Sequence, residues 1–147
     1  MARWAPVVIR IVLGISFIAH GAQKVLGLWG GLGFSGTIDA FAKQGMPAPM
    51  TVLVMAGEFL GGLGIFFGYL TRLAAFGPAI VMVGAMLLVH AQNGFFMNWF
   101  NTPGRGHGIE CCLAYLAMAV SLMMTGAGPL SIDVLRGGPK RRDRDLL

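Results

Sequence analysis

The chain has 147 residues, of which 56% are hydrophobic and only 12% are charged, with a net charge of +5 at pH 7. An average soluble domain carries about 25% charged residues, so this composition argues against a soluble globular protein. The length allows one domain, and the chain has the composition of a small membrane protein.

Four apolar segments are separated by short polar stretches. Each has the roughly 17–25 residues with which a helix crosses a bilayer core of about 30 Å. We therefore predict an all-α membrane protein, an antiparallel bundle of four transmembrane helices. Only Thr71 and Arg72 separate the second and third segments, which predicts a tight hairpin there. The predicted spans cover residues 7–26, 50–70, 73–92 and 109–127.

The distribution of lysine and arginine predicts that both termini are cytoplasmic. Cytoplasmic loops of membrane proteins carry an excess of these residues. With the N-terminus inside, Arg3, Arg72 and the basic C-terminal residues are cytoplasmic, whereas only Lys43 and Arg105 lie outside. We expect a multi-pass protein of the plasma (inner) membrane whose tail contacts anionic lipid rather than nucleic acid. The expected parts are a four-helix transmembrane domain, residues 1–135, and a basic cytoplasmic tail, residues 136–147.

Two short helices are predicted outside the four spans. Residues 37–44 in the first outer loop read as an interfacial helix, with Thr37 as its N-cap and Gly45 just beyond its end. Residues 131–135 read as one capped turn before the tail.

A polar stripe runs along the first span. Ser16, His20, Gln23 and Lys24 follow the spacing that places helical residues on one face. At 1.5 Å per residue, His20 lies about 9 Å below the outer surface, and Glu58 on the second span lies about 12 Å below it. Because a charge at the bilayer centre costs about 2.5–3.5 kcal/mol, Glu58 needs a partner or a proton. Similar depth predicts a hydrogen bond or ion pair between His20 and Glu58.

The outer ends of the other spans also carry ionisable side chains. His90 lies near the end of the third span, and Glu110 opens the fourth. We expect a shallower tier around these two residues and Lys24. The residues expected at its mouth are Asn93, Asn98 and His107, beside an aromatic belt of Phe95, Phe96, Trp99 and Phe100. Two interpretations remain open: a ligand, proton or redox site, or paired polar groups that only fix the order of the helices.

The inner half offers Arg10 as its intramembrane charge. Arg10 is close enough to the inner surface to extend its guanidinium toward water. We expect instead a structural ion pair between Arg10 and Asp133.

Small residues in the second span predict close helix packing. Gly57 and Gly61, and then Gly64 and Gly68, are each four residues apart. This spacing lets helix backbones approach one another, and it indicates a bundle or a homo-oligomer without deciding between them.

The two cysteines, Cys111 and Cys112, are adjacent within an apolar run. Small buried thiols are the favoured interpretation. A redox dithiol is the alternative, which neither a CxxC motif nor a metal-ligand spacing supports.

The chain resembles the DoxX-like family of small four-helix membrane proteins over nearly its whole length up to the tail. The resemblance rests on the order and spacing of several short motifs rather than on any one of them. These motifs lie at residues Arg10–Gly14, His20–Lys24, Glu58–Gly62, Gly68–Ala75, His90 with Asn93–Phe96, and Gly126–Asp133.

The resemblance implies a membrane subunit of a quinone-linked oxidoreductase, including sulfur oxidation systems, or a partner of redox-defence enzymes. The chain has no haem-attachment motif, dinucleotide fingerprint or iron–sulfur cysteine spacing. We therefore expect no intrinsic cofactor, and electrons would come from a redox partner protein.

The leading hypothesis is a membrane subunit that binds quinone or quinol in a polar pocket in the outer half. His20 and Glu58 would be the reacting partners, and Phe95 and Trp99 a gate. The expected ligand-binding residues or proton path are Lys24, His90, Asn93 and Glu110.

Three alternatives stay open. The first is a non-catalytic accessory or scaffold subunit of a larger membrane complex, with the glycine faces and the basic tail as contact surfaces. The second is passage of a small molecule or proton, against which the inner half offers only Arg10. The third is haem or metal ligation by His20 and His90, which two isolated histidines support weakly; no metal site is predicted.

Overall fold

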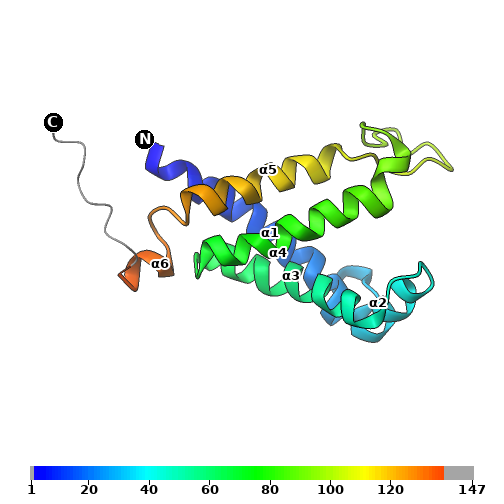
Figure 1. Ribbon diagram of the computed structural model, residues 1–147, viewed down its shortest axis with the longest axis horizontal. Helices are drawn as coiled ribbons and strands as arrows, with labels where there is room; N and C mark the ends of the chain where they lie inside the picture. The colour runs from blue at the N-terminus through cyan, green and yellow to red at the C-terminus, as the bar shows by residue number, and fades with distance from the viewer. Residues whose placement is uncertain (1, 138–147) are drawn as a thin grey trace.

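The computed structural model describes residues 2–137, all of whose regular elements are helical, as predicted. Residues 138–147 of the predicted tail lie outside this part of the chain. The molecule is elongated, with the start of α1 and the short helix α6 at one end, here called the terminal end, and α2 with the loop of residues 94–109 at the other, the loop end (Figure 1). The α-helices are α1 (Ala5–Leu26), α2 (Gly33–Ala42), α3 (Ala48–Phe67), α4 (Thr71–Ala85), α5 (Glu110–Thr125) and α6 (Ile132–Leu135).

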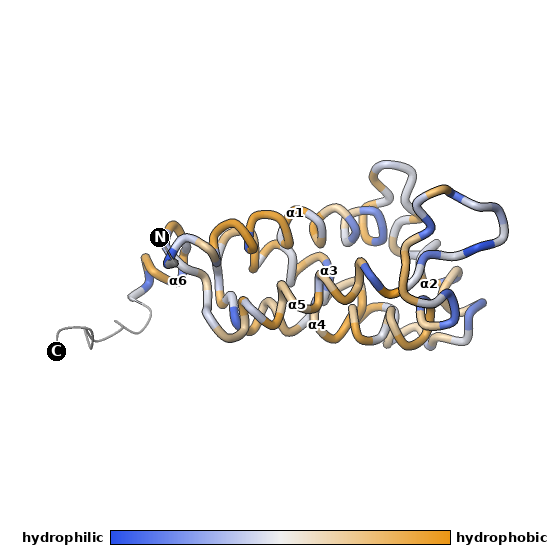
Figure 2. Tube along the Cα trace, turned by 90° about the horizontal axis from the view of Figure 1, so that it is seen from above, coloured by the Kyte–Doolittle hydropathy of each residue, from blue (hydrophilic) through white to orange (hydrophobic). Residues whose placement is uncertain are grey.

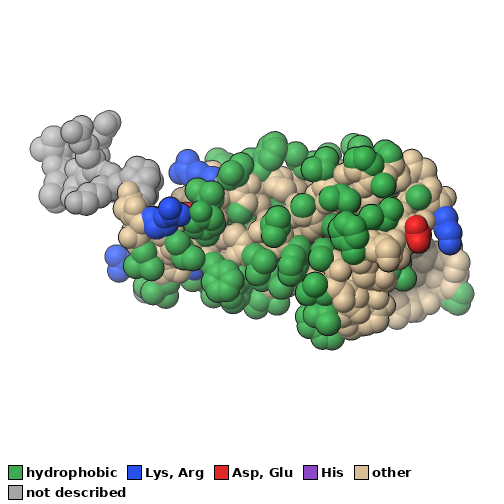
Figure 3. Space-filling view, turned by 90° about the horizontal axis from the view of Figure 1, so that it is seen from below, with side chains coloured by type: hydrophobic (Ala, Val, Ile, Leu, Met, Phe, Trp, Pro, Cys, Tyr) green, Lys and Arg blue, Asp and Glu red, His purple; other side chains and the backbone are tan. Residues whose placement is uncertain are grey.

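Three helices are long and apolar enough to cross a membrane. They are α1, α3 and the continuous helical stretch Thr71–Asn93, in which α4 extends through a π-helical turn, Met86–His90, and a 3₁₀ turn, Ala91–Asn93. The helix α5 is apolar but shorter, with 16 residues. Hydrophilic residues gather toward the two ends of the molecule (Figure 2). Hydrophobic side chains cover the length between them (Figure 3). Such an exposed apolar surface is typical of a protein surrounded by lipid.

The helices pack in the order α1, α3, α4, α5, with α5 also contacting α1. In the core, large apolar side chains from α1, α3 and α5 meet alanines from α4 and α5. The core residues are Leu13, Phe17, Ile65, Ala75, Ala79, Ala119 and Leu122.

Glycines allow α3 to lie very close to both of its neighbours. A Cβ atom on Gly21 of α1 would lie 2.6 Å from the Cα atom of Phe59, and one on Gly61 of α3 would lie 2.7 Å from Cδ of Pro78. Because such distances exclude any side chain, the small-residue faces are used for packing within one chain. The other glycines crowded in this way are Gly14, Gly62 and Gly64.

The turn between α3 and α4 differs from the prediction. It comprises residues 68–70, and Thr71 and Arg72 already belong to α4. Gly68 ends α3 in the left-handed conformation, with φ +66°. The Asp133 carboxylate then accepts hydrogen bonds from the first free amides of α4, those of Leu70 and Thr71. Asp133, which is distant in sequence, therefore caps α4, and the helix begins before the first residue of the predicted apolar span.

The predicted short helix in the first loop exists, but its start was predicted wrongly. α2 begins at Gly33, so Thr37 lies inside it rather than at its N-cap. The Thr37 hydroxyl is buried and donates to the backbone carbonyl of Lys24 at 3.1 Å. Thr37 therefore joins α2 to the end of α1. The predicted turn after α5 is confirmed as α6, and Ser131 caps it by accepting from the amide of Val134.

The glycine contacts give a test of the packing. We expect Gly21→Ala to lower the free energy of unfolding by about 1–3 kcal/mol, because its Cβ would overlap the backbone of α3. Gly84→Ala is the matched control, since no atom outside its own helix lies within 4 Å of a Cβ there. The control should leave stability unchanged or raise it by up to about 1 kcal/mol. Thermal unfolding in detergent measures both, and equal effects would contradict this packing.

Candidate functional site

An ion pair joins α1 and α3 inside the bundle. Lys24 Nζ donates to Glu58 Oε2 at 2.5 Å, and it is the only salt bridge among residues 2–137. The Glu58 side chain is 6% exposed and that of Lys24 is 23% exposed. The close approach at Gly21 positions the pair, because it holds the two backbones near enough for the side chains to meet.

The structure corrects the predicted pairing of His20 with Glu58. His20 is exposed and makes no side-chain hydrogen bond within the described residues, whereas Glu58 is held by Lys24. His20 precedes Gly21, which faces α3, and successive helical residues point about 100° apart. The imidazole is therefore turned away from α3. The longer lysine side chain reaches back from one turn farther along α1.

The polar stripe of α1 lies partly toward α5. Tyr115 of α5 donates its hydroxyl to Ser16 Oγ at 3.4 Å, and its ring packs edge-on against Phe17 with centroids 5.8 Å apart. His20 lies one turn beyond Ser16 on the same face. Toward the loop end, the ribbons of α1 and α5 separate (Figure 1). The sequence pattern did not single out Tyr115, since a lone tyrosine in an apolar run gives no specific signal.

The loop of residues 94–109 contains most of the predicted shallower tier. His90 Nδ1 donates to the carbonyl of His107 at 2.8 Å, and the Asn93 amide donates to the same carbonyl at 3.2 Å. Glu110 Oε2 accepts from the amide of Met97 at 3.0 Å. His90 and Asn93 thus meet at the carbonyl of His107, and Glu110 holds the same loop through Met97.

Asn98 fixes the tip of this loop. Its side chain is buried, donates to the carbonyls of Thr102 and Arg105, and accepts from the amide of Thr102. The Asn98 backbone amide donates to His107 Nδ1 at 3.2 Å. These contacts account for the loop polar groups locally, without a ligand.

The predicted single tier is thus divided into two clusters. Lys24 belongs with Glu58 between α1 and α3, whereas His90, Asn93 and Glu110 lie between the end of the Thr71–Asn93 helix and the start of α5. No hydrogen bond or salt bridge within residues 2–137 joins the two clusters. The prediction of one site used only the depth of each residue along its span. Depth does not say which way a side chain points around its helix, so residues on separate faces were grouped together.

Aromatic side chains cover the outside of the loop. Phe95 is 48% exposed, Trp99 68% and Phe100 93%. Phe95 packs edge-on against Phe96, with ring centroids 5.2 Å apart. Their exposure suits a headgroup-level position. The gate suggested for Phe95 and Trp99 stays a prediction.

At the terminal end, the predicted ion pair of Arg10 with Asp133 is wrong. The buried Arg10 guanidinium donates to the carbonyl of Leu130 at 2.6 Å. Both Asp133 oxygens are used by the amides of Leu70 and Thr71, at 2.7 and 2.9 Å. Each side chain therefore fastens the segment after α5 to a different helix. In the sequence, only the position of Asp133 after the fourth span indicated that it could cap α4.

The remaining candidates form no further site within the described residues. Cys111 is partly buried, Cys112 is buried, and both are free thiols in the first turn of α5. Residues 2–137 contain no group of three or more His, Cys, Asp or Glu side chains that could hold a metal ion.

The chain is similar to known membrane proteins over most of its length. The model of the DoxX family matches residues 5–91. "Putative oxidoreductase CatD" of Bacillus subtilis (strain 168) is 30% identical over 85% of this chain and 81% of its own length. "Inner membrane protein YqjF" of Escherichia coli (strain K12) is 33% identical over 87% of this chain and 88% of its own. "Uncharacterized membrane protein Rv3486" of Mycobacterium tuberculosis (strain ATCC 25618 / H37Rv) is 30% identical over 85% of this chain and 77% of its own. No solved structure matches the chain.

The ion pair can be tested by a double-mutant cycle. We expect Lys24→Met or Glu58→Met alone to lower the free energy of unfolding by at least about 2 kcal/mol, because each leaves a largely buried charge without its partner. The double variant should recover most of this loss. His20→Ala should change stability by less than about 1 kcal/mol, since an exposed side chain away from such contacts contributes little. Additive losses in the cycle, measured by unfolding in detergent, would contradict the pairing.

Proposed function

The chain belongs to the DoxX family, and we propose that it is an integral subunit of a redox-associated membrane system that binds a quinone or quinol beside Lys24 and Glu58. The observation that carries the proposal is the buried ion pair between α1 and α3. One of the relatives has the word oxidoreductase in its name. Electrons would come from a separate redox protein that docks on the membrane.

The proposed topology has four spans, with the terminal end in the cytoplasm and the protein in the inner membrane. Arg3, Arg72 and Arg136 lie at the terminal end, which supports a cytoplasmic position for it. The short α5 spans about 24 Å at 1.5 Å per residue, so it would cross with help from the loop at its start. α2 would lie at the outer interface. The name of the Escherichia coli relative supports the inner membrane.

The chemistry of the ion pair suits a quinone ring. Lys24 has three N–H groups and uses one of them on Glu58, so others can donate to a quinone carbonyl. Glu58 uses Oε2 for this bond, so Oε1 can accept from a quinol hydroxyl. Reduction of a quinone takes up two electrons and two protons, and the pair lies where it could exchange those protons.

His20 would connect the ion pair with the loop end. It is exposed, and it shares a face of α1 with Lys24. We place the ligand ring beside this face of α1. His20 would then pass protons between the ligand and water.

The alternatives find less support in the geometry. The glycine faces that the scaffold hypothesis needed as contact surfaces are already packed inside the chain. The passage hypothesis needs polar access at both ends. At the terminal end, Arg10 is buried and bonded to the carbonyl of Leu130.

Binding of a short-chain quinone tests the proposal. We expect purified protein in detergent to bind decyl-ubiquinone saturably, as measured by quenching of tryptophan fluorescence. Glu58→Gln should weaken binding by about tenfold or more, because a hydrogen bond to a charged group contributes about 1.5–3 kcal/mol. Lys43→Gln is the control, since Lys43 is exposed beyond α2.

Two results would overturn this function. One is the absence of saturable quenching in the wild-type protein. The other is an equal dissociation constant in the Glu58→Gln and Lys43→Gln variants, provided that a cooperative thermal unfolding transition shows both to be folded.

A further inference from the structure

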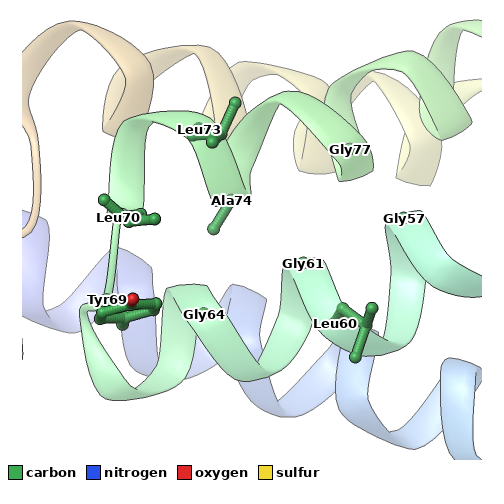
Figure 4. Close-up of a pocket in the computed structure, with 9 residues that line it drawn as sticks. All are labelled: Gly57, Leu60, Gly61, Gly64, Tyr69, Leu70, Leu73, Ala74 and Gly77. Carbon is green, nitrogen blue, oxygen red and sulfur yellow. The ribbon is translucent and has the colours of Figure 1, made fainter.

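An apolar groove lies between α3 and α4, toward the terminal end. It has a volume of about 260 Å³. Figure 4 shows Ala74 pointing from α4 toward the glycines of α3, with Tyr69 and Leu70 at one end. The glycines Gly57, Gly61 and Gly64 contribute no side chains there, so the groove runs close to the backbone.

A second hollow continues the groove around α3. It has a volume of about 380 Å³ and shares Leu60, Gly64 and Tyr69 with the first. It reaches Ile132 of α6. The two hollows therefore form one apolar depression that converges on Tyr69, at the terminal end of α3.

The shape of this depression suits a hydrocarbon chain. From Gly57 to Tyr69 the helix extends about 18 Å at 1.5 Å per residue. An empty gap along this length would lose dispersion contacts on both of its walls. Because the helices that form it are long and apolar enough to cross a membrane, a slender apolar molecule of the bilayer is the natural occupant.

The charge at the end of the groove selects the type of lipid. The guanidinium of Arg136 lies 5.2 Å from the centre of the Tyr69 ring. Asp133 is the only acidic residue in this part of the described chain, and its oxygens are occupied by the amides of Leu70 and Thr71. A headgroup arriving beside Tyr69 therefore meets a cation, and residues 2–137 place no free carboxylate beside it.

We propose that this groove is a binding site for one anionic phospholipid. One acyl chain lies in the open groove beside the contact of α3 with α4, and the phosphate lies beside Arg136 and the Tyr69 hydroxyl. The site is separate from the Lys24–Glu58 pair, so it does not depend on the proposed quinone function.

Lipid titration of the purified full-length chain tests the site. After exchange into lipid-free detergent, native mass spectrometry measures the binding of phosphatidylglycerol and of phosphatidylcholine with matched acyl chains. We expect phosphatidylglycerol to bind about fivefold more tightly, and Arg136→Gln to remove this preference, because one arginine near an anionic headgroup contributes about that factor. Arg105→Gln, in the loop-end segment, is the control. Residues 137–147 are unchanged in all variants, so the ratio of the wild-type to the variant dissociation constant reports Arg136 alone.

A second pair of variants tests the groove itself. Leu60 lines both hollows and is exposed, so Leu60→Trp should fill them and reduce binding of both lipids. Leu53→Trp is the control, because Leu53 is exposed on α3 but lines neither hollow. Equal lipid binding by the two tryptophan variants, or by the two glutamine variants, would overturn the proposal. Conversion of a wild-type dimer to a monomer by Leu60→Trp, with lipid binding unchanged, would assign the groove to a second copy of the chain.

Discussion

The close approach of α1 and α3 holds the polar site of this protein together. Gly21 admits no side chain against Phe59, and Gly62 admits none against the backbone of α1. In hydrocarbon, burial of apolar surface does not drive helices together, so such contacts supply the packing energy. They also bring Lys24 within reach of Glu58, which gives a charged group in the bundle the partner that it needs.

The polar groups at the two ends of the molecule serve different purposes. At the loop end, His90, Asn93 and Glu110 satisfy the backbone of the loop after the third apolar helix. At the terminal end, Arg10 and Asp133 fasten the segment after α5. The Lys24–Glu58 pair differs from both groups, because it joins two charged side chains to each other rather than to the backbone.

Two kinds of membrane molecule fit two separate parts of the surface. A ring with carbonyl groups matches the ion pair, where donors and an acceptor meet inside the bundle. A flexible acyl chain with an anionic headgroup matches the α3–α4 groove, which is apolar until it reaches Tyr69 and Arg136. Both follow from one feature of α3: it carries its charge on the side facing α1 and glycines toward both neighbouring helices.

The sequence by itself determined the helices, the hairpin between the second and third apolar segments, and the gathering of ionisable residues toward one end. These features can be read from the sequence because hydropathy and helical rise depend only on position along the chain. The family resemblance also followed from local motifs. Tertiary structure decided which partners meet: Lys24 rather than His20 for Glu58, and backbone groups rather than each other for Arg10 and Asp133. Which side chains pair depends on how each helix is rotated about its axis and on how far each side chain extends. The depth of a residue along its span gives neither quantity.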